Sequence, residues 1–207
     1  MTEGLIITIS REAYCGGDEL AKQLAEKLGF KFYDREVIAL ASEKSGIHED
    51  HFESIEKKPT NSILYSVVMG MYSSRGAYVR LDDVLTDDKI YKIQADMIRE
   101  IAADGNCIFV GRCSDYILRN NPKCVNIFLR ADKKDRIDRV VKEQNVTEAE
   151  AEKIISRADK KRRSYYNYYT NREWGAIGNY DISLNISALS QDKMCDFLVD
   201  YLNSINK

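Results

Sequence analysis

Short apolar runs alternate with stretches of helical periodicity along most of the chain. The runs at residues 5–9, 107–110 and 125–129 are continuous rather than alternating, which is typical of strands buried on both faces of a parallel sheet. Weaker runs at residues 30–33 and 180–186 predict two more strands. Strands that alternate with helices favour the α/β class. We therefore expect a five-stranded parallel sheet flanked by helices.

Between these runs, apolar residues recur three and four positions apart, as they do on the buried face of a helix. Gly29 and Gly46 follow two such segments and are typical helix ends. Thr147 and Glu150 form a capping-box pattern, which predicts the start of another helix. The predicted helices cover about residues 20–28, 37–46, 90–101 and 132–143, and further ones begin after Thr147 and after Ser190.

The chain has 207 residues, enough to bury one substantial core, so a single domain is expected. The helical periodicity degrades between residues 47 and 88. This segment is interpreted as an inserted, mostly helical region on the substrate side. The core of the domain then consists of residues 1–46 and 89–207.

Charge and composition narrow the possible partners. The formal net charge is -2, which gives no bulk attraction to nucleic acid or to an anionic membrane. No apolar stretch approaches the roughly 18 residues of a membrane span, and the first residues lead into a strand rather than a signal peptide. Five scattered cysteines without a C-x-x-C pair suit a reducing compartment. We expect a cytoplasmic protein without nucleic-acid or membrane partners, and the sequence does not indicate its oligomeric state.

Three polar clusters follow three different predicted strands, the third of them at the end of a basic helix. They are the loop at residues 10–19, the Gly111–Arg112 pair with Asp115, and the basic run RADKKRR at residues 157–163. Each has an ordinary structural interpretation: a plain turn, an arginine paired with a carboxylate, and a solvated helix face. In a parallel sheet, however, ligands bind beyond the carboxyl ends of the strands, where these clusters meet. Their convergence favours a common site.

The first cluster, in ITISREAYCGGDELAKQLAEKLG, has the strand, glycine turn and helix that often bind nucleotide phosphates. The pattern G-x-x-x-x-G-K-[ST] is broken, because Gly16 is followed by Gly17 and Asp18 instead of lysine. Backbone N–H groups from Cys15 to Glu19 can still form an anion-binding nest at the helix start. Arg11 is the best candidate within the loop to restore positive charge.

Four segments together resemble the cytidylate kinase-like family, a branch of the P-loop nucleoside monophosphate kinases. They are the loop quoted above, FYDRE at 32–36, IFVGRCSDYIL at 108–118 and RRSYYNYYTNREWGAIGNYDISLNIS at 162–187. The resemblance implies a phosphate loop on a five-stranded sheet, a helical insertion on the monophosphate side and a mobile lid at about residues 157–179. ATP with Mg²⁺ would be the phosphoryl donor, and no metal ligand is assigned.

The resemblance also implies roles for particular residues. Arg157 and Arg162 match the lid arginines around the transferred phosphoryl group and are the expected catalytic residues. The expected phosphate-binding residues are Arg11, Cys15, Gly16, Gly17, Asp18 and Glu19, and the expected acceptor-binding residues are Asp34, Arg35 and Arg112. Arg136 and Arg139 lie where the donor base and the lid base are usually bordered, or they are surface charges of a helix.

An aromatic tract with tyrosines at 165, 166, 168 and 169 follows the basic run. Such a tract more often packs a lid or hinge than stacks on a base, with Trp174 as its anchor. We therefore assign these tyrosines no catalytic role.

The expected function is phosphoryl transfer from ATP to a nucleoside monophosphate, with a CMP-like acceptor favoured. The missing lysine leaves open a non-catalytic nucleotide-binding protein with a degenerate phosphate loop. The insertion at residues 47–88 leaves open a kinase of a non-nucleotide metabolite. Fold alone does not decide among these three functions.

Overall fold

The computed structural model describes residues 4–57 and 86–205. Most of the expected insertion at residues 47–88 therefore lies outside the described residues. Its beginning forms helix α3 (Glu49–Lys57), in which Phe52 and Ile55 are fully buried in the main core.

The sheet consists of five parallel strands in the order β2-β3-β1-β4-β5. The strands are β1 (Ile6–Arg11), β2 (Lys31–Tyr33), β3 (Cys107–Val110), β4 (Cys124–Arg130) and β5 (Ile182–Asn185). The central strands are buried on both faces, which explains their continuous apolar sequences. The expected five-stranded parallel sheet is confirmed.

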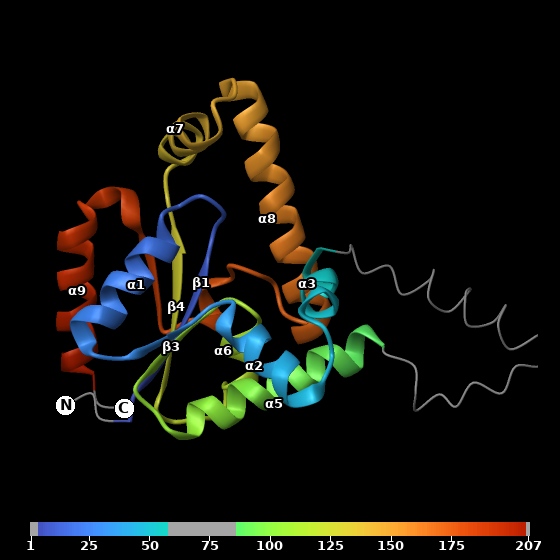
Figure 1. The fold of residues 1–207 in the computed structure, drawn as a ribbon. Coiled ribbons are helices and arrows are strands. Elements are labelled where there is room, and N and C mark those ends of the chain that lie inside the picture. The colour runs from blue at the N-terminus through green and yellow to red at the C-terminus, as the bar shows by residue number, and fades with distance from the viewer. Residues whose placement is uncertain (1–3, 58–85, 206–207) are drawn as a thin grey trace, which may run out of the picture.

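Helices cover both faces of the sheet (Figure 1). On one face lie α1 (Gly17–Leu28) and α9 (Gln191–Ser204). On the other lie α2 (Glu36–Ser45), α3, α5 (Asp87–Ala103) and the short α6 (Ser114–Ile117). Because successive side chains of a strand point to opposite faces, Ile6 belongs to the core under α5 and Ile7 to the core under α1.

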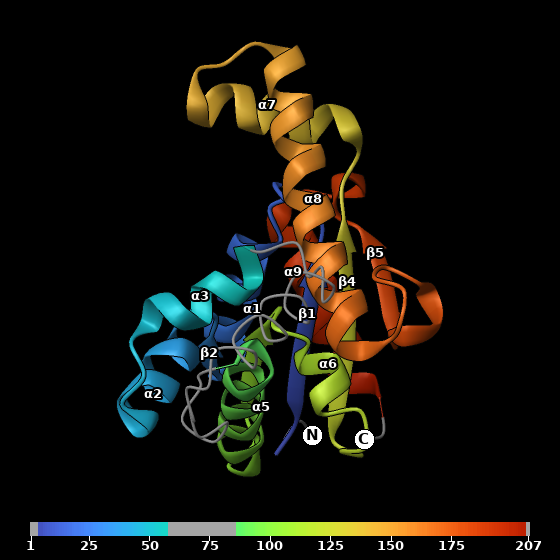
Figure 2. The ribbon, with the colours of Figure 1, turned by 90° about the vertical axis from the view of Figure 1, so that its right-hand side faces the viewer.

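Two helices rise beyond the carboxyl ends of the strands and form what we call the arm (Figures 1 and 2). They are α7 (Lys133–Gln144) and α8 (Glu148–Thr170), and α8 begins with the expected capping box of Thr147 and Glu150. Val140, Ala151 and Ile155 form a small separate core between them. The upper part of the arm therefore packs mainly on itself, while the lower end of α8 enters the main core.

The fifth strand is shorter than the apolar run at residues 180–186 predicts. A 3₁₀ turn at Ile177–Asn179 precedes it, and pairing with β4 starts at Ile182. At its end, the Asn185 side chain accepts a hydrogen bond from the backbone N–H of Ser187 at 3.2 Å and turns the chain into a second 3₁₀ segment. Local side-chain hydrogen bonding thus competes with the ladder.

Two glycines allow a test of the packing at the amino end of the sheet. Gly105 has φ +67°, and a Cβ there would lie 2.7 Å from the Cα of Gly4. Gly46 has φ +71°, but a Cβ there would meet nothing within 4 Å. We expect Gly46→Ala to lower the free energy of unfolding by about 1–2 kcal/mol, the cost of the left-handed conformation.

Gly105→Ala should cost more than Gly46→Ala, because the backbone of Gly4 must also move. Urea unfolding of both variants measures the difference. Equal losses of stability in the two variants would contradict the close approach of these two backbone segments.

Candidate functional site

A cavity of about 490 Å³ opens at the carboxyl edge of the sheet, between the strand ends and α8. Its walls come from β1, β3, the segment after β2, and α8. The lining residues are Ser10, Arg11, Asp34, Arg35, Val110, Gly111, Arg112, Cys113, Ala158, Lys161, Arg162, Tyr165, Tyr166 and Trp174. The three polar clusters of the sequence thus meet in one cavity.

The phosphate loop joins the end of β1 to the start of α1. Gly16 is the residue before the helix and has φ 90°, a conformation that favours glycine. A Cβ on Gly17 would lie 3.1 Å from both the Cβ of Arg11 and the Sγ of Cys15. The second glycine therefore lets the side chain of Arg11 cross closely over the first turn of α1.

The guanidinium group of Arg11 forms an ion pair with the carboxylate of Asp18. Its Nε and Nη2 atoms both lie 2.8 Å from Oδ1 of Asp18. The Arg11 side chain is 12% exposed and that of Asp18 is 46% exposed. An arginine from the strand end thus brings positive charge over the start of the helix, and a carboxylate of the same loop already partners it.

Arg162 approaches the same loop from the arm. Its Nη1 donates a hydrogen bond of 2.8 Å to the backbone oxygen of Arg11. Burial, reinforced by the neighbouring charge of Arg11, lowers the pKa of Arg162 to about 10. The group remains protonated at neutral pH. Two guanidinium groups are therefore held next to each other beside Asp18, which favours binding of a further anion.

Arg112 also lines the cavity. It follows β3 in the left-handed conformation, with φ 56°. Its Nε donates a hydrogen bond of 2.8 Å to the backbone oxygen of Asp34, and its Nη1 lies 3.5 Å from Oε1 of Gln94. This places the predicted acceptor residues Asp34 and Arg112 together.

Of the other predicted residues, Arg35 lines this cavity, whereas Glu19 and Arg157 do not. Arg35 lines the cavity, but its side chain is 82% exposed, with Glu53 at 4.0 Å. Glu19 pairs with Arg139 at 3.5 Å. Arg157 is exposed on α8 and is not among the lining residues of the cavity, whereas Lys161 is. Lys161 belongs to the basic run, and the sequence alone assigns it no role.

Cys15 is buried behind the phosphate loop rather than presented to the large cavity. Burial raises the pKa of its thiol to about 11, so it stays protonated at neutral pH. Together with Gly16, Leu20, Arg139 and Met194, it borders a second cavity of about 280 Å³ on the other side of the loop. Cys15 is therefore a packing residue of this wall.

Sequence reasoning left Arg136 undecided between a role at the site and a surface charge. The surface interpretation is wrong, because Arg136 is 7% exposed. Its side chain pairs with Glu12 at 3.1 Å and with Asp159, and its Nε donates to the backbone oxygen of Ala13 at 2.9 Å. Sequence analysis missed Glu12 and Asp159, since nothing in a charged helix marks which carboxylates turn inward.

The aromatic tract packs the lower end of α8 into the domain. Tyr165 and Tyr166 are buried, and the Tyr166 hydroxyl donates a hydrogen bond of 2.6 Å to Oδ2 of Asp115. Burial raises the pKa of Asp115, partly opposed by this hydrogen bond. The Tyr165 hydroxyl accepts from Nε2 of Gln94 at 3.1 Å. These tyrosines fix the helix beside Arg112.

A comparison with protein-family models shows to which family the chain belongs. The model of the cytidylate kinase-like family matches residues 6–188. The chain belongs to the cytidylate kinase-like family. The matched range includes the phosphate loop, the turn carrying Arg112 and the arm. A search of curated proteins gave no match.

Solved structures share the fold. An uncharacterized protein from Eubacterium ventriosum has a TM-score of 0.70 and 27% sequence identity, over 97% of this chain and 99% of that one. Shikimate kinase from Bacteroides thetaiotaomicron has a TM-score of 0.53 and 15% identity, covering 96% and 98% of the two chains. Shikimate kinase from Acinetobacter baumannii, in complex with shikimate, has a TM-score of 0.51 and 11% identity, covering 98% and 96%. The fold of this family member is that of P-loop kinases.

Two features are absent from the part of the chain that the structure describes. None of its helices is long and apolar enough to cross a bilayer. Within residues 4–57 and 86–205, no three His, Cys, Asp or Glu side chains gather as ligands of a metal ion.

The Arg11–Asp18 pair generates a prediction for anion binding. The Asp18 carboxylate competes with any anion for the guanidinium of Arg11, so Asp18→Asn should tighten the binding of tripolyphosphate without Mg²⁺. We expect a threefold to fivefold lower Kd, roughly the free energy of a partly exposed ion pair. Isothermal titration calorimetry measures it. Glu26→Gln, exposed on the same helix, is the matched control, and an unchanged or higher Kd for Asp18→Asn would exclude this competition.

Proposed function

We propose that the protein transfers a phosphoryl group from ATP to a nucleoside monophosphate, with a CMP-like acceptor favoured. The single observation that carries this proposal is the convergence of cationic side chains from separate elements on one cavity. These are Arg11, Arg35, Arg112, Lys161 and Arg162. The family and the fold support a phosphotransferase, and the charge of the cavity supports anionic substrates.

The donor would lie along the phosphate loop. Its phosphates would bind the backbone N–H groups between Cys15 and Glu19 and the guanidinium groups of Arg11 and Arg162. The second cavity, with apolar walls from Leu20 and Met194 and a cation from Arg139, suits the donor base. Both cavities border the loop, so a nucleotide could pass from one to the other across Gly16.

In this proposal Arg11 takes the place of the missing lysine. It enters from the end of β1 instead of the first turn of α1, and the close approach at Gly17 lets it reach the same side of the loop. A guanidinium offers two oxygens a planar fork, whereas lysine offers a compact charge. Arg162 would add positive charge next to Arg11, on the same phosphates. Catalysis would depend on positioning and charge neutralisation, with no covalent intermediate.

The residues at the loop fit a magnesium ion in part. Mg²⁺ in phosphotransferases usually keeps water and phosphate oxygens and takes one or two carboxylates from the protein. Asp18 supplies such a carboxylate, is 46% exposed and lies directly at the loop. Asp18 would hold the ion once a phosphate replaces it on Arg11. The bound ion would supply charge neutralisation at the donor phosphates.

The acceptor end combines cations with one carboxylate. Arg35 and Arg112 would bind the acceptor phosphate, while the side chain of Asp34 could accept a hydrogen bond from a hydroxyl or amino group. A nucleoside monophosphate offers both kinds of group. A small hydroxy acid offers a carboxylate in place of the phosphate, together with hydroxyl groups, so a metabolite kinase is the second candidate function, favoured by the same residues.

A coupled ADP-release assay tests the proposal. The acceptors are CMP, dCMP, UMP, AMP and GMP, with shikimate and gluconate as non-nucleotide hydroxy acids. We expect turnover with a monophosphate and most with CMP or dCMP. Turnover with a hydroxy acid alone would support the second candidate. If no acceptor is used while ATP still raises the melting temperature, the protein is a non-catalytic nucleotide binder.

Removing the charge of Arg162 should reduce turnover. We expect Arg162→Met to lower kcat about 10²- to 10³-fold, the usual effect of losing a fixed group that stabilises transition-state charge. Lys160→Met, which removes an exposed charge from the same helix, is the control and should retain wild-type kcat. A wild-type kcat for Arg162→Met would remove Arg162 from the mechanism.

Arg112 should act on the acceptor alone. Arg112→Lys keeps the charge but loses the hydrogen bond to Asp34 and the planar fork, so we expect KM for the acceptor to rise about tenfold. KM for ATP should stay unchanged. Arg119→Lys, a few residues further along the chain, is the control, and a rise in KM for ATP of the same size would contradict the assignment of Arg112 to the acceptor.

A further inference from the structure

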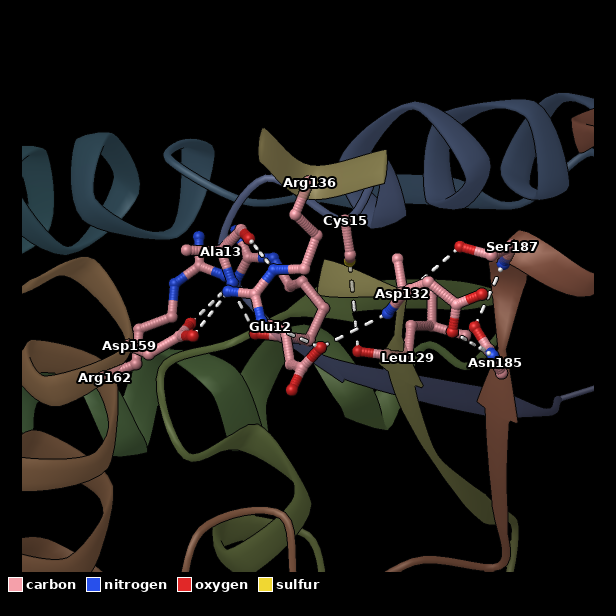
Figure 3. A network of polar contacts seen from close by, with 12 residues as sticks. Glu12, Ala13, Cys15, Leu129, Asp132, Arg136, Asp159, Arg162, Asn185 and Ser187 are labelled. Carbon is pink, nitrogen blue, oxygen red and sulfur yellow. Dashed lines mark hydrogen bonds and ion pairs between the residues drawn. The ribbon is translucent and has the colours of Figure 1, made fainter. Parts of the chain in front are cut away.

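Four consecutive residues of the phosphate loop, from Arg11 to Tyr14, contact the arm. Figure 3 shows Glu12 and Ala13 beside Arg136 and Asp159. The backbone oxygen of Arg11 accepts a hydrogen bond from Arg162, and Glu12 pairs with Arg136. Ala13 donates its N–H to Oδ1 of Asp159 at 2.8 Å. These contacts come from both α7 and α8, so both helices of the arm hold the loop.

Tyr14 completes this set of contacts. It has φ 59°, and its ring packs against the small core between the two arm helices. Its hydroxyl accepts a hydrogen bond of 3.2 Å from Nε2 of Gln144. A bulky residue at positive φ is uncommon and persists only where its surroundings hold it. The conformation of the loop at Tyr14 therefore depends on the arm.

The centre of the contact is an ion cluster of Arg136, Glu12 and Asp159. Their side chains are only 8%, 26% and 17% exposed. Arg136 bonds both carboxylates and the backbone oxygen of Ala13, and Asp159 bonds the N–H of the same residue. Both polar groups of the Ala13 backbone are thus satisfied by the arm. Removing one member of such a cluster leaves charge without a partner in a poorly solvated place.

We infer that Arg136 and Asp159 are positioning residues for the donor phosphates, and that the arm and the phosphate loop move as one unit. Neither residue lines the large cavity, so both act through the loop backbone. The inference rests on the proposed function for the identity of the ligand. It goes beyond that function because it assigns the shape of the phosphate site to the helices of the arm.

This arrangement has a consequence for anion binding. The N–H of Ala13 is already taken by Asp159, so the backbone groups that could bind phosphate lie after Ala13. The direction in which these N–H groups point is set by the backbone conformation of Tyr14 and Gly16, which lie between Ala13 and helix α1. Loosening Ala13 from the arm frees this segment, and binding of phosphate must then order it again.

Asp159→Asn is the most direct test. The variant keeps an oxygen near the Ala13 N–H but removes the charge that pairs with Arg136. We expect faster amide hydrogen exchange at residues 11–16 in the absence of ligand. We also expect about a tenfold higher Kd for tripolyphosphate, the size expected for the loss of one charge-assisted hydrogen bond. If the protein is active, KM for ATP should rise while KM for the acceptor stays the same.

A second variant and a control separate positioning from folding. Arg136→Lys retains the charge but not the three-way contact, so it should show the same changes to a smaller degree. Glu152→Gln breaks the ion pair of Glu152 with Lys133, which has an N–O distance of 2.8 Å and joins the same two helices away from the loop. Glu152→Gln should leave both exchange in the loop and tripolyphosphate binding as in the wild type.

The possible outcomes distinguish this inference from the proposed function. Faster loop exchange and weaker tripolyphosphate binding in Asp159→Asn, with Glu152→Gln normal, support the inference even if no acceptor is ever phosphorylated. Wild-type Kd in Asp159→Asn overturns it, whatever the exchange rates are. An active wild-type kinase whose Asp159→Asn variant has normal KM values also overturns it while leaving the proposed function intact.

Discussion

The site depends on the burial of one guanidinium between two carboxylates. Arg136 cannot leave water at low cost unless its charge is matched, and Glu12 and Asp159 match it from the loop and from α8. Because these two residues belong to different parts of the fold, their common partner joins the parts. The loop and the arm then have one conformation that satisfies all three charges.

Positive and negative side chains are also paired in the rest of the loop. The guanidinium groups of Arg11 and Arg162 are adjacent, and Asp18 is the exposed carboxylate between them and the solvent. Among these residues the exposed carboxylate is the one that an incoming anion can displace, since Glu12 and Asp159 are held inside. A loop without its lysine can therefore keep a positive site, provided that a strand-end arginine and an arm arginine stay close together. The acidic residues that break the usual pattern at Asp18 and Glu19 are compatible with such a site.

Sequence predicted the sheet because apolar runs that must be buried on both faces leave few alternatives, as at β1 and β3. It also predicted the convergence of Arg11, Arg112 and Arg162, since parallel strands end at the same edge. It did not predict the partners of these groups. Whether Arg136 faces water or the loop depends on the rotation of α7 about its axis and on its packing against α8, and a charged helix with few apolar residues does not specify either. Likewise, β5 ended early because a local Asn185 hydrogen bond outcompeted the ladder.

Helix α8 connects the two halves of the site in a way that separate loops could not. Near its middle, Asp159 and Arg162 hold the phosphate loop, and one turn later Tyr165 contacts Gln94 beside Arg112. Tyr166 then fixes the helix to Asp115 in the turn that follows Arg112. A continuous helix has a rise of about 1.5 Å per residue and little freedom to stretch. The distance between the contacts with the loop and the contacts beside Arg112 is consequently set by α8 itself, and a displacement of this helix must alter both sides of the cavity together.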